Sequence, residues 1–195
     1  MGSESSSRLF YDLVWPQAEM VLRYAQVLSG SVNDAEDLAQ EALLKAYRAI
    51  DQFKPGTEVR AWLMTILRHA HIDRIRKRAT QSGTVSLDSL DYDPPQSEAI
   101  PAAMPEEWDN EQKLLQQFAD AAIIEAMQRL PTEMRWALLL VDIEGLDLKD
   151  AAEVMNVPLG TVKSRCHRGR QLLRRELIRV SDQSELVARS IDQEA

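Results

Sequence analysis

Apolar side chains recur every three to four positions along most of the chain, which is the spacing of amphipathic helices. The pattern breaks near Pro16 and over the turn-rich residues 53–57, and it is lost throughout 79–111. No segment shows the sustained alternation of apolar and polar residues that a half-buried strand would have. The sequence therefore predicts an all-α fold made of two small helical domains, residues 8–78 and 112–179.

Three further segments lie outside the predicted domains. Residues 79–111 contain eight acidic residues, four prolines and no lysine or arginine, so we expect a flexible acidic linker between the domains. We expect the serine-rich residues 1–7 to be disordered. Residues 180–195 form a polar tail that can hold a short helix and for which the sequence indicates no function.

Residues 148–177 have the pattern of a helix-turn-helix. A short helix of small and apolar residues ends at Asn156-Val157-Pro158, because proline disfavours helical geometry at the residue before it, and a basic helix follows. In this motif the first side chains of the second helix reach base edges, and later cations contact phosphates. An ordinary helical hairpin with a solvated basic face would share the charge run but not this turn. We expect base-edge contacts from Thr161, Lys163, Ser164 and Arg165, and phosphate contacts from His167, Arg168 and the later arginines.

Two helix starts carry residues that suit N-terminal capping, in which a side-chain oxygen accepts a free backbone N–H. Asn33 or Asp34 precedes an amphipathic helix that runs to Ile50. Thr161 lies at the start of the basic helix. We expect these residues to cap their helices.

A second basic segment lies within residues 58–78. Its apolar positions can pack inward, while its arginines form a cationic surface opposed only by Glu58 and Asp73. Single-stranded DNA binding requires cations for the backbone and aromatic rings for the bases. Trp62 is the aromatic candidate, although a tryptophan at this spacing more often packs in a core.

The overall charge argues against a nucleic-acid-binding protein, but its distribution argues for one. The net charge is −8 and the isoelectric point about 5.0. Positive charge is concentrated in residues 60–78 and 161–179, with the acidic residues between and beyond them. This segregation indicates two DNA-facing patches.

The remaining composition limits other functions. We find no apolar run of about 18 residues that would span a membrane, and no signal-peptide core near the N-terminus. The single cysteine, Cys166, is expected to be buried, and one cysteine fits the reducing cytosol. No nucleophile–base pair, phosphate-binding glycine loop or metal-ligand spacing is apparent, so we expect no enzyme activity, no cofactor and no metal.

Three stretches in this order resemble a known family. They are DAEDLAQEALLKAYRAI, FKPGTEVRAWLMTILRHAHIDRIRKR and LPTEMRWALLLVDIEGLDLKDAAEVMNVPLGTVKSRCHRGRQLLRREL. The chain resembles bacterial sigma factors of the sigma-70 family, and its two-domain layout resembles the extracytoplasmic-function (group 4) class. His69 and Cys166 depart from the family pattern, which often has asparagine and a larger aliphatic residue at these places.

The resemblance implies a role for each stretch. The first resembles region 2.2, which docks on the clamp helices of the largest RNA polymerase subunit and implies core-binding candidates at Asp37, Gln40, Glu41, Lys45 and Arg48. The second resembles regions 2.3 and 2.4, which melt and capture the −10 element and imply candidates at Arg60, Trp62, Arg68, His69, Asp73, Arg74 and Arg76. The final helix resembles region 4.2, which reads the −35 element as duplex and implies the same candidates as the helix-turn-helix pattern, Thr161, Lys163, Ser164, Arg165, His167 and Arg168.

The function implied is that of a cytoplasmic transcription initiation factor. It would bind core RNA polymerase, recognise a −35 duplex and open the −10 element of specific promoters, with an anti-sigma factor as a further partner. By analogy, the acidic linker would imitate RNA in the polymerase cleft, although solubility explains its charge almost as well. Two alternatives remain: a helix-turn-helix regulator that binds duplex DNA without melting it, and a mimic that titrates an anti-sigma factor.

Overall fold

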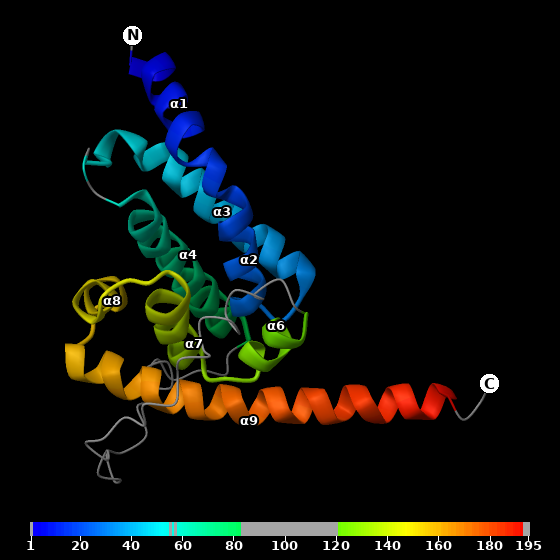
Figure 1. Cartoon of the computed structure of the whole chain (residues 1–195). Coiled ribbons are helices and arrows are strands. Elements are labelled where there is room, and N and C mark those ends of the chain that lie inside the picture. The colour runs from blue at the N-terminus through cyan, green and yellow to red at the C-terminus, as the bar shows by residue number, and fades with distance from the viewer. Residues whose placement is uncertain (1, 55, 57, 83–120, 193–195) are drawn as a thin grey trace.

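The computed structural model describes residues 2–54, 56, 58–82 and 121–192, and all regular elements in these ranges are helical (Figure 1). This confirms the predicted all-α class. The helices form an N-terminal group up to Ser82 and a C-terminal group from Ala121 onward. Most of the predicted acidic linker, and the predicted start of the second domain at 112–120, lie outside the described residues.

The N-terminal group is built on three helices that pack against one another: α2 (Ala18–Leu28), α3 (Val32–Ala49) and α4 (Val59–Ser82). The buried face of α3 carries Leu38, Ala42 and Ala46 at four-residue spacing, as the sequence pattern indicated. Small alanines on this face allow close approach of the neighbouring helices. The α4 helix extends four residues beyond the predicted boundary at 78.

The chain before α2 forms α1 (Gly2–Leu13) and a 3₁₀ turn, Trp15–Gln17. The interruption falls at Pro16, as predicted, because proline fits the first turn of a helix but not its interior. The expectation that residues 1–7 are disordered is wrong for Gly2 onward. Hydroxyls of this segment reach α3 and the 3₁₀ turn Ile50–Gln52 after it: Ser6 donates to Asp51 (2.6 Å), and Ser7 lies 2.8 Å from the Tyr47 hydroxyl.

The capping of α3 also differs from the expectation. Ser31 is the N-cap, and its hydroxyl accepts the backbone N–H of Asp34 at 3.2 Å. Asn33 and Asp34 lie inside the first turn. Ser31 has the extended backbone that an N-cap requires, and the helix therefore begins at Val32, before both expected caps.

The C-terminal group contains α6 (Ala121–Gln128), α7 (Thr132–Leu138), α8 (Leu148–Met155) and α9 (Leu159–Asp192). A π-helical turn, Leu139–Ile143, continues α7. The long α9 passes against α6, α7 and α8 and extends beyond them towards the C-terminus (Figure 1). Gly169 allows close approach of α9 to α7, because a Cβ at this position would lie 3.2 Å from Leu138 Cγ.

The α9 helix is longer than the sequence analysis predicted. It continues from the basic segment through residue 192, where we expected a tail from 180 with at most a short separate helix. The physical reason is visible in the sequence, since residues 170–192 contain neither proline nor glycine to end the helix.

The two helical groups pack against each other. The α2 helix contacts α6 and α7, and α4 contacts α8. The buried apolar residues of both groups form one continuous cluster. The sequence indicated two domains but not this contact between them, which determines the surroundings of several candidate site residues.

Candidate DNA-binding and polymerase-binding sites

Residues at both ends of α8 determine the bounds of the first helix of the helix-turn-helix. Asp147 caps α8 by accepting the backbone N–H groups of Lys149 and Asp150, both at 2.8 Å. Asn156 ends α8 in the left-handed region (φ 53°), which asparagine tolerates better than most residues. The Asp147 cap follows the sequence rule for helix starts but was not among the predicted caps.

The α9 helix begins directly after this turn. The carbonyl of Pro158 accepts the backbone N–H of Thr161 at 2.9 Å. Thr161 therefore lies in the first turn of the helix rather than at its cap, which corrects the expectation. Its own carbonyl accepts the hydroxyl of Ser164 at 2.9 Å.

One face of α9 is buried against α7. Val162 and Cys166 are almost completely inaccessible, and the Cys166 thiol lies 3.7 Å from the carbonyl oxygen of Ala137. Burial raises the pKa of the Cys166 thiol to about 11, so it is not a reactive thiolate at neutral pH. Burial of Cys166 was predicted, and the structure confirms it.

Most of the −35 candidates lie on the accessible side of α9. Lys163 is exposed, and Thr161, Ser164, His167 and Arg168 are partly exposed. Arg165 is the exception: only 7% of the residue is exposed, and its Nη1 lies 3.0 Å from Glu133 Oε2 of α7. In this conformation Arg165 contacts a protein carboxylate where a base edge was expected.

One of the later arginines also has a structural contact in place of the expected phosphate. Arg170 forms a two-point ion pair with Asp142 of the π-helical turn, with 3.0 Å between Nε and Oδ2. The carboxylate of Asp142 is nearly buried. Such bidentate geometry is among the stronger charge pairs in proteins. Arg170 therefore ties α9 to the end of α7.

The −10 candidates lie along α4 with different surroundings. Trp62 is partly buried against Phe53, with ring centroids 5.2 Å apart. His69 and Arg76 are exposed. Arg60 and Arg68 instead contact the C-terminal group: Arg60 Nη2 lies 2.9 Å from Glu144 Oε1, and Arg68 Nη2 lies 3.4 Å from Glu133 Oε2.

The last two −10 candidates join α4 to α3. Asp73 accepts a hydrogen bond from Lys45 Nζ at 2.8 Å, and this contact lowers the pKa of the Asp73 carboxyl. Arg74 lies 3.3 Å from carboxylate oxygens of both Asp34 and Asp37. Their contacts here are those of a helix–helix interface.

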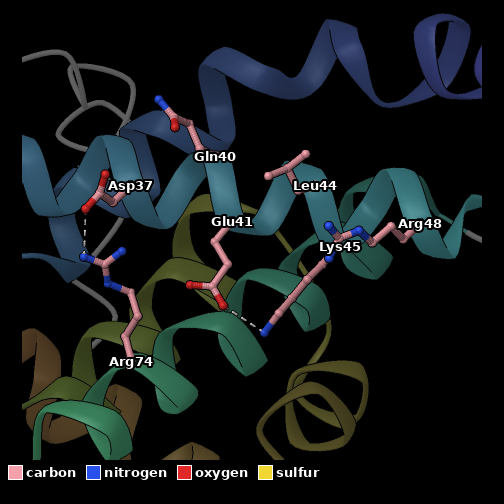
Figure 2. A pocket seen from close by; sticks show the side chains of 7 residues that line it. All are labelled: Asp37, Gln40, Glu41, Leu44, Lys45, Arg48 and Arg74. Atoms are coloured by element: carbon pink, nitrogen blue, oxygen red, sulfur yellow. Dashed lines mark hydrogen bonds and ion pairs between the residues drawn. The ribbon is translucent and has the colours of Figure 1, made fainter. Parts of the chain in front are cut away.

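A pocket on α3 brings together all the predicted core-binding residues. It is lined by Asp37, Gln40, Glu41, Leu44, Lys45, Arg48 and Arg74 (Figure 2). Lys45 Nζ lies 3.2 Å from Glu41 Oε1, so part of the charge is paired within the pocket. Leu44 is 55% exposed and was not among the candidates. The sequence feature that could have identified Leu44 is an apolar residue at an outward-facing helical position.

The contact between the two groups contains polar residues that the sequence analysis missed. Arg135 of α7 donates to the carbonyls of Val27 (2.9 Å) and Leu28 (3.2 Å). Gln128 of α6 donates to the carbonyls of Gln26 (2.7 Å) and Ser29 (3.0 Å). The sequence gave little indication of these contacts, because arginine and glutamine at such helical positions ordinarily face solvent.

A buried histidine lies at the same contact. Trp136 Nε1 donates to His71 Nδ1 at 3.2 Å. Burial is the main cause that lowers the pKa of His71, to about 4, and the nearby cations Arg135, Arg68 and Arg74 contribute. His71 is therefore neutral at pH 7, as an imidazole that accepts at Nδ1 must be.

None of the described helices is both long enough and apolar enough to span a membrane.

Comparison with known proteins assigns the chain to a family. Residues 17–81 match the family described as Sigma-70 region 2, and residues 120–173 match Sigma-70, region 4. The chain is 36% identical to the ECF RNA polymerase sigma factor SigE of Mycolicibacterium smegmatis over 185 residues, which cover 94% of this chain and 67% of the relative. It is 32% identical to the ECF RNA polymerase sigma factor SigW of Bacillus subtilis, covering 86% of this chain and 88% of the relative.

A solved structure has a similar fold. The sigma factor RpoE of Bartonella quintana, in its co-crystal structure with the anti-sigma factor NepR, is 28% identical and has a TM-score of 0.62. The match covers 86% of this chain and 96% of that one. The sequence relatives and the two family matches agree, and the chain belongs to the extracytoplasmic-function sigma factors of the sigma-70 family.

Proposed function

We propose that this protein gives core RNA polymerase its specificity for a set of promoters. Sigma factors are initiation factors rather than enzymes, and we expect this chain to perform no chemistry of its own. The observation that carries the proposal is the presence, in one chain, of a region 2 match with a basic α4 and a region 4 match with a basic α9. The place of action is the cytoplasm, with the polymerase.

The C-terminal domain reads the −35 element as duplex DNA. Its turn places the N-terminus of α9 at the surface, where Lys163 is exposed and Thr161, Ser164, His167 and Arg168 are accessible in part. Arg165 joins them when it leaves Glu133. Base edges are read by the first turns of such a helix, and the later cations hold the backbone.

The N-terminal domain opens and holds the −10 element. Arg60, Arg68 and Arg76 supply cations along α4, while Trp62 and the exposed His69 supply rings against which bases can stack. Extrusion of a base costs a few kcal/mol, which such contacts offset. Asp73 and Arg74 support this surface by joining α4 to α3.

The α3 pocket binds core polymerase. It combines charged groups of both signs with the exposed Leu44, which is the composition of a protein–protein contact rather than of a DNA site. The expected occupant is the clamp-helix region of the largest subunit. An anti-sigma factor is a further expected partner, because the related RpoE was crystallised with one.

The alternative, a regulator that binds duplex DNA without melting it, receives no support from the comparisons. Such a protein needs a helix-turn-helix but not the region 2 match over residues 17–81. The relatives that match 94% and 86% of this chain are both named as ECF RNA polymerase sigma factors.

Run-off transcription tests the proposal directly. Purified core polymerase is assayed on a library of promoter fragments, with and without this protein. We expect initiation that depends on the protein and arises from fragments sharing two spaced sequence elements. Duplex binding without any initiation, on a core enzyme from the same organism and with no inhibitor bound, would favour the regulator instead.

A further inference from the structure

An apolar side chain is exposed at the end of α9 that faces duplex DNA in the proposed function. Leu159 is the first residue of α9 and is 41% exposed. Among the described residues of the C-terminal group, the other exposed large apolar residue is Ile178, about five turns further along the same helix. A lone exposed leucine is ordinary on a protein surface. The position of Leu159 is what gives it a specific partner.

The first turn of α9 holds Leu159 at the surface. The residues on either side, Pro158 and Gly160, are exposed as well, and a Cβ at Gly160 would meet no atom within 4 Å. The carbonyl of Pro158 accepts the backbone N–H groups of Thr161 at 2.9 Å and of Val162 at 3.3 Å. Val162 is completely buried and anchors the turn on the domain core. Leu159 therefore projects from an ordered turn that no other part of the described chain covers.

Leu159 lies on the same side of α9 as two polar −35 candidates. Residues four positions apart are neighbours on a helix surface, so Leu159, Lys163 and His167 form one row along α9. Lys163 is exposed and His167 is partly exposed. A duplex that contacts Lys163 at a base edge therefore also meets the side chain of Leu159.

The major groove offers a leucine one favourable partner. Its base edges consist of hydrogen-bond donors and acceptors, together with the C5-methyl group of thymine. A leucine placed against a donor or acceptor removes it from water without replacing its hydrogen bond, which costs free energy. Against a thymine methyl, the same leucine buries apolar surface on both sides of the contact. The thymine methyl is therefore the base-edge group that Leu159 can bind.

We propose that Leu159 is a specificity-determining residue that recognises thymine: its side chain contacts the C5-methyl group of one thymine in the −35 element. The inference rests on the −35 role proposed above for α9, and it adds an apolar contact to the polar contacts expected from Lys163 and Ser164. Burial of one methyl-sized group corresponds to about a fourfold change in affinity. Leu159 thus favours thymine at one position and leaves the phosphate contacts to the cations of α9.

Removal of the methyl group from DNA tests the contact. Polymerase holoenzyme is assembled with the full chain and bound, in competition assays, to a promoter recovered by run-off transcription. Each thymine of its −35 element, on either strand, is replaced in turn by deoxyuridine, which lacks the C5-methyl group and keeps the base pairing. We expect the affinity to fall about fourfold at one position. A −35 element without thymine on either strand, or without a sensitive thymine, overturns the proposal.

Variants of the protein assign the missing methyl group to its partner. Leu159→Ala should bind the thymine and deoxyuridine promoters equally, with the affinity that the unsubstituted protein has for the deoxyuridine promoter. Leu159→Met keeps an apolar side chain of similar size and should retain most of the discrimination. Ile178→Ala is the matched control, because it removes an exposed apolar side chain from the same helix, and it should retain the full discrimination. Circular dichroism checks that all three variants are folded.

Two results with these variants would reject the role of Leu159. If Leu159→Ala still prefers thymine to deoxyuridine, another group, such as the methyl of Thr161, contacts the base. If Leu159→Ala weakens binding to both promoters by the same factor, Leu159 contacts the polymerase or stabilises the helix instead of contacting the methyl group.

Failure of the proposed function can be distinguished from failure of the thymine contact. If the holoenzyme selects no promoters that share a −35 element, the proposed function is wrong and the contact is rejected with it. If it selects promoters whose −35 element contains thymine and deoxyuridine has no effect, the −35 role of α9 stands and only the contact by Leu159 is rejected.

Discussion

Two interfaces of this protein differ sharply in composition. Inside the C-terminal domain, the contact of α9 with α7 buries apolar groups, with Leu138 facing Gly169 and with Val162 and Cys166 inaccessible, and it contains one charge pair, Arg165–Glu133. Between the domains, polar groups carry part of the contact, including Gln128, Arg135, the His71–Trp136 pair and the Arg68–Glu133 pair. The first composition is typical of a permanent core, and the second of a contact between domains that move. The difference indicates which part of the molecule must remain folded and which can open.

The largest expected effect comes from creating a cavity in the α7–α9 interface. Leu138 is 1% exposed, so Leu138→Ala should lower the free energy of unfolding by about 2–5 kcal/mol. Urea unfolding followed by far-UV circular dichroism measures the change. Ile178→Ala, at a 55% exposed position on the same α9 helix, is the matched control and should change stability by no more than about 0.5 kcal/mol. Equal effects would mean that the α7–α9 interface is not the core we describe.

Acid should open the contact between the domains before it unfolds them. His71 is neutral with its pKa lowered to about 4, whereas an exposed histidine titrates near 6.5, so the opened protein binds the proton more readily. The contact is at full strength above about pH 6.5 and weakens as the pH falls towards about 4. At pH 5 the expected loss is about 2 kcal/mol.

Fluorescence energy transfer gives the test, with dyes on cysteines introduced at the exposed positions Glu36 of α3 and Glu153 of α8. The transfer efficiency is measured from pH 7 to pH 5. It should fall over this window, and His71→Gln should flatten the dependence. A dependence that persists unchanged in His71→Gln would assign it to other groups. The cations Arg135, Arg68 and Arg74 near the ring disfavour its protonation in the closed contact.

Arg165 is relevant to both interfaces, because it lies on α9 and its side chain contacts Glu133, which also contacts Arg68 of the other domain. Arg165→Ala should cost about 1–3 kcal/mol at one base pair of the −35 element, if the side chain makes a bidentate base contact. Competition binding of polymerase holoenzyme to promoters substituted at each −35 position measures this. An equal loss on random DNA would identify a phosphate contact instead.

The smallest expected effect concerns one polar contact between the domains. Gln128→Ala removes the hydrogen bonds to the carbonyls of Gln26 and Ser29 and should weaken the contact by about 1 kcal/mol. Transfer efficiency should fall slightly, while the urea midpoint of the C-terminal domain stays nearly constant. A large loss of that midpoint would show that the two domains unfold as one unit.

Much of the local structure could be predicted because it depends on neighbouring residues. The periodicity of Leu38, Ala42 and Ala46 determined the buried face of α3, and Pro16 determined the break before α2. The end of α8 at Asn156 also followed from residues beside it. The local errors were of the same kind: Ser31 caps α3 instead of Asn33 or Asp34, and α9 continues past 179 because nothing stops it.

The sequence by itself therefore determined the helical class, the helix-turn-helix and the positions of the two basic faces. Only the tertiary structure decided what those basic side chains contact. Arg165 meets Glu133 across 32 residues, and Arg68 meets the same carboxylate across 65. Arg170 pairs with Asp142 across 28. Helical periodicity relates residues three or four positions apart, but the partner of a long charged side chain depends on how whole helices dock, and no local pattern records that arrangement.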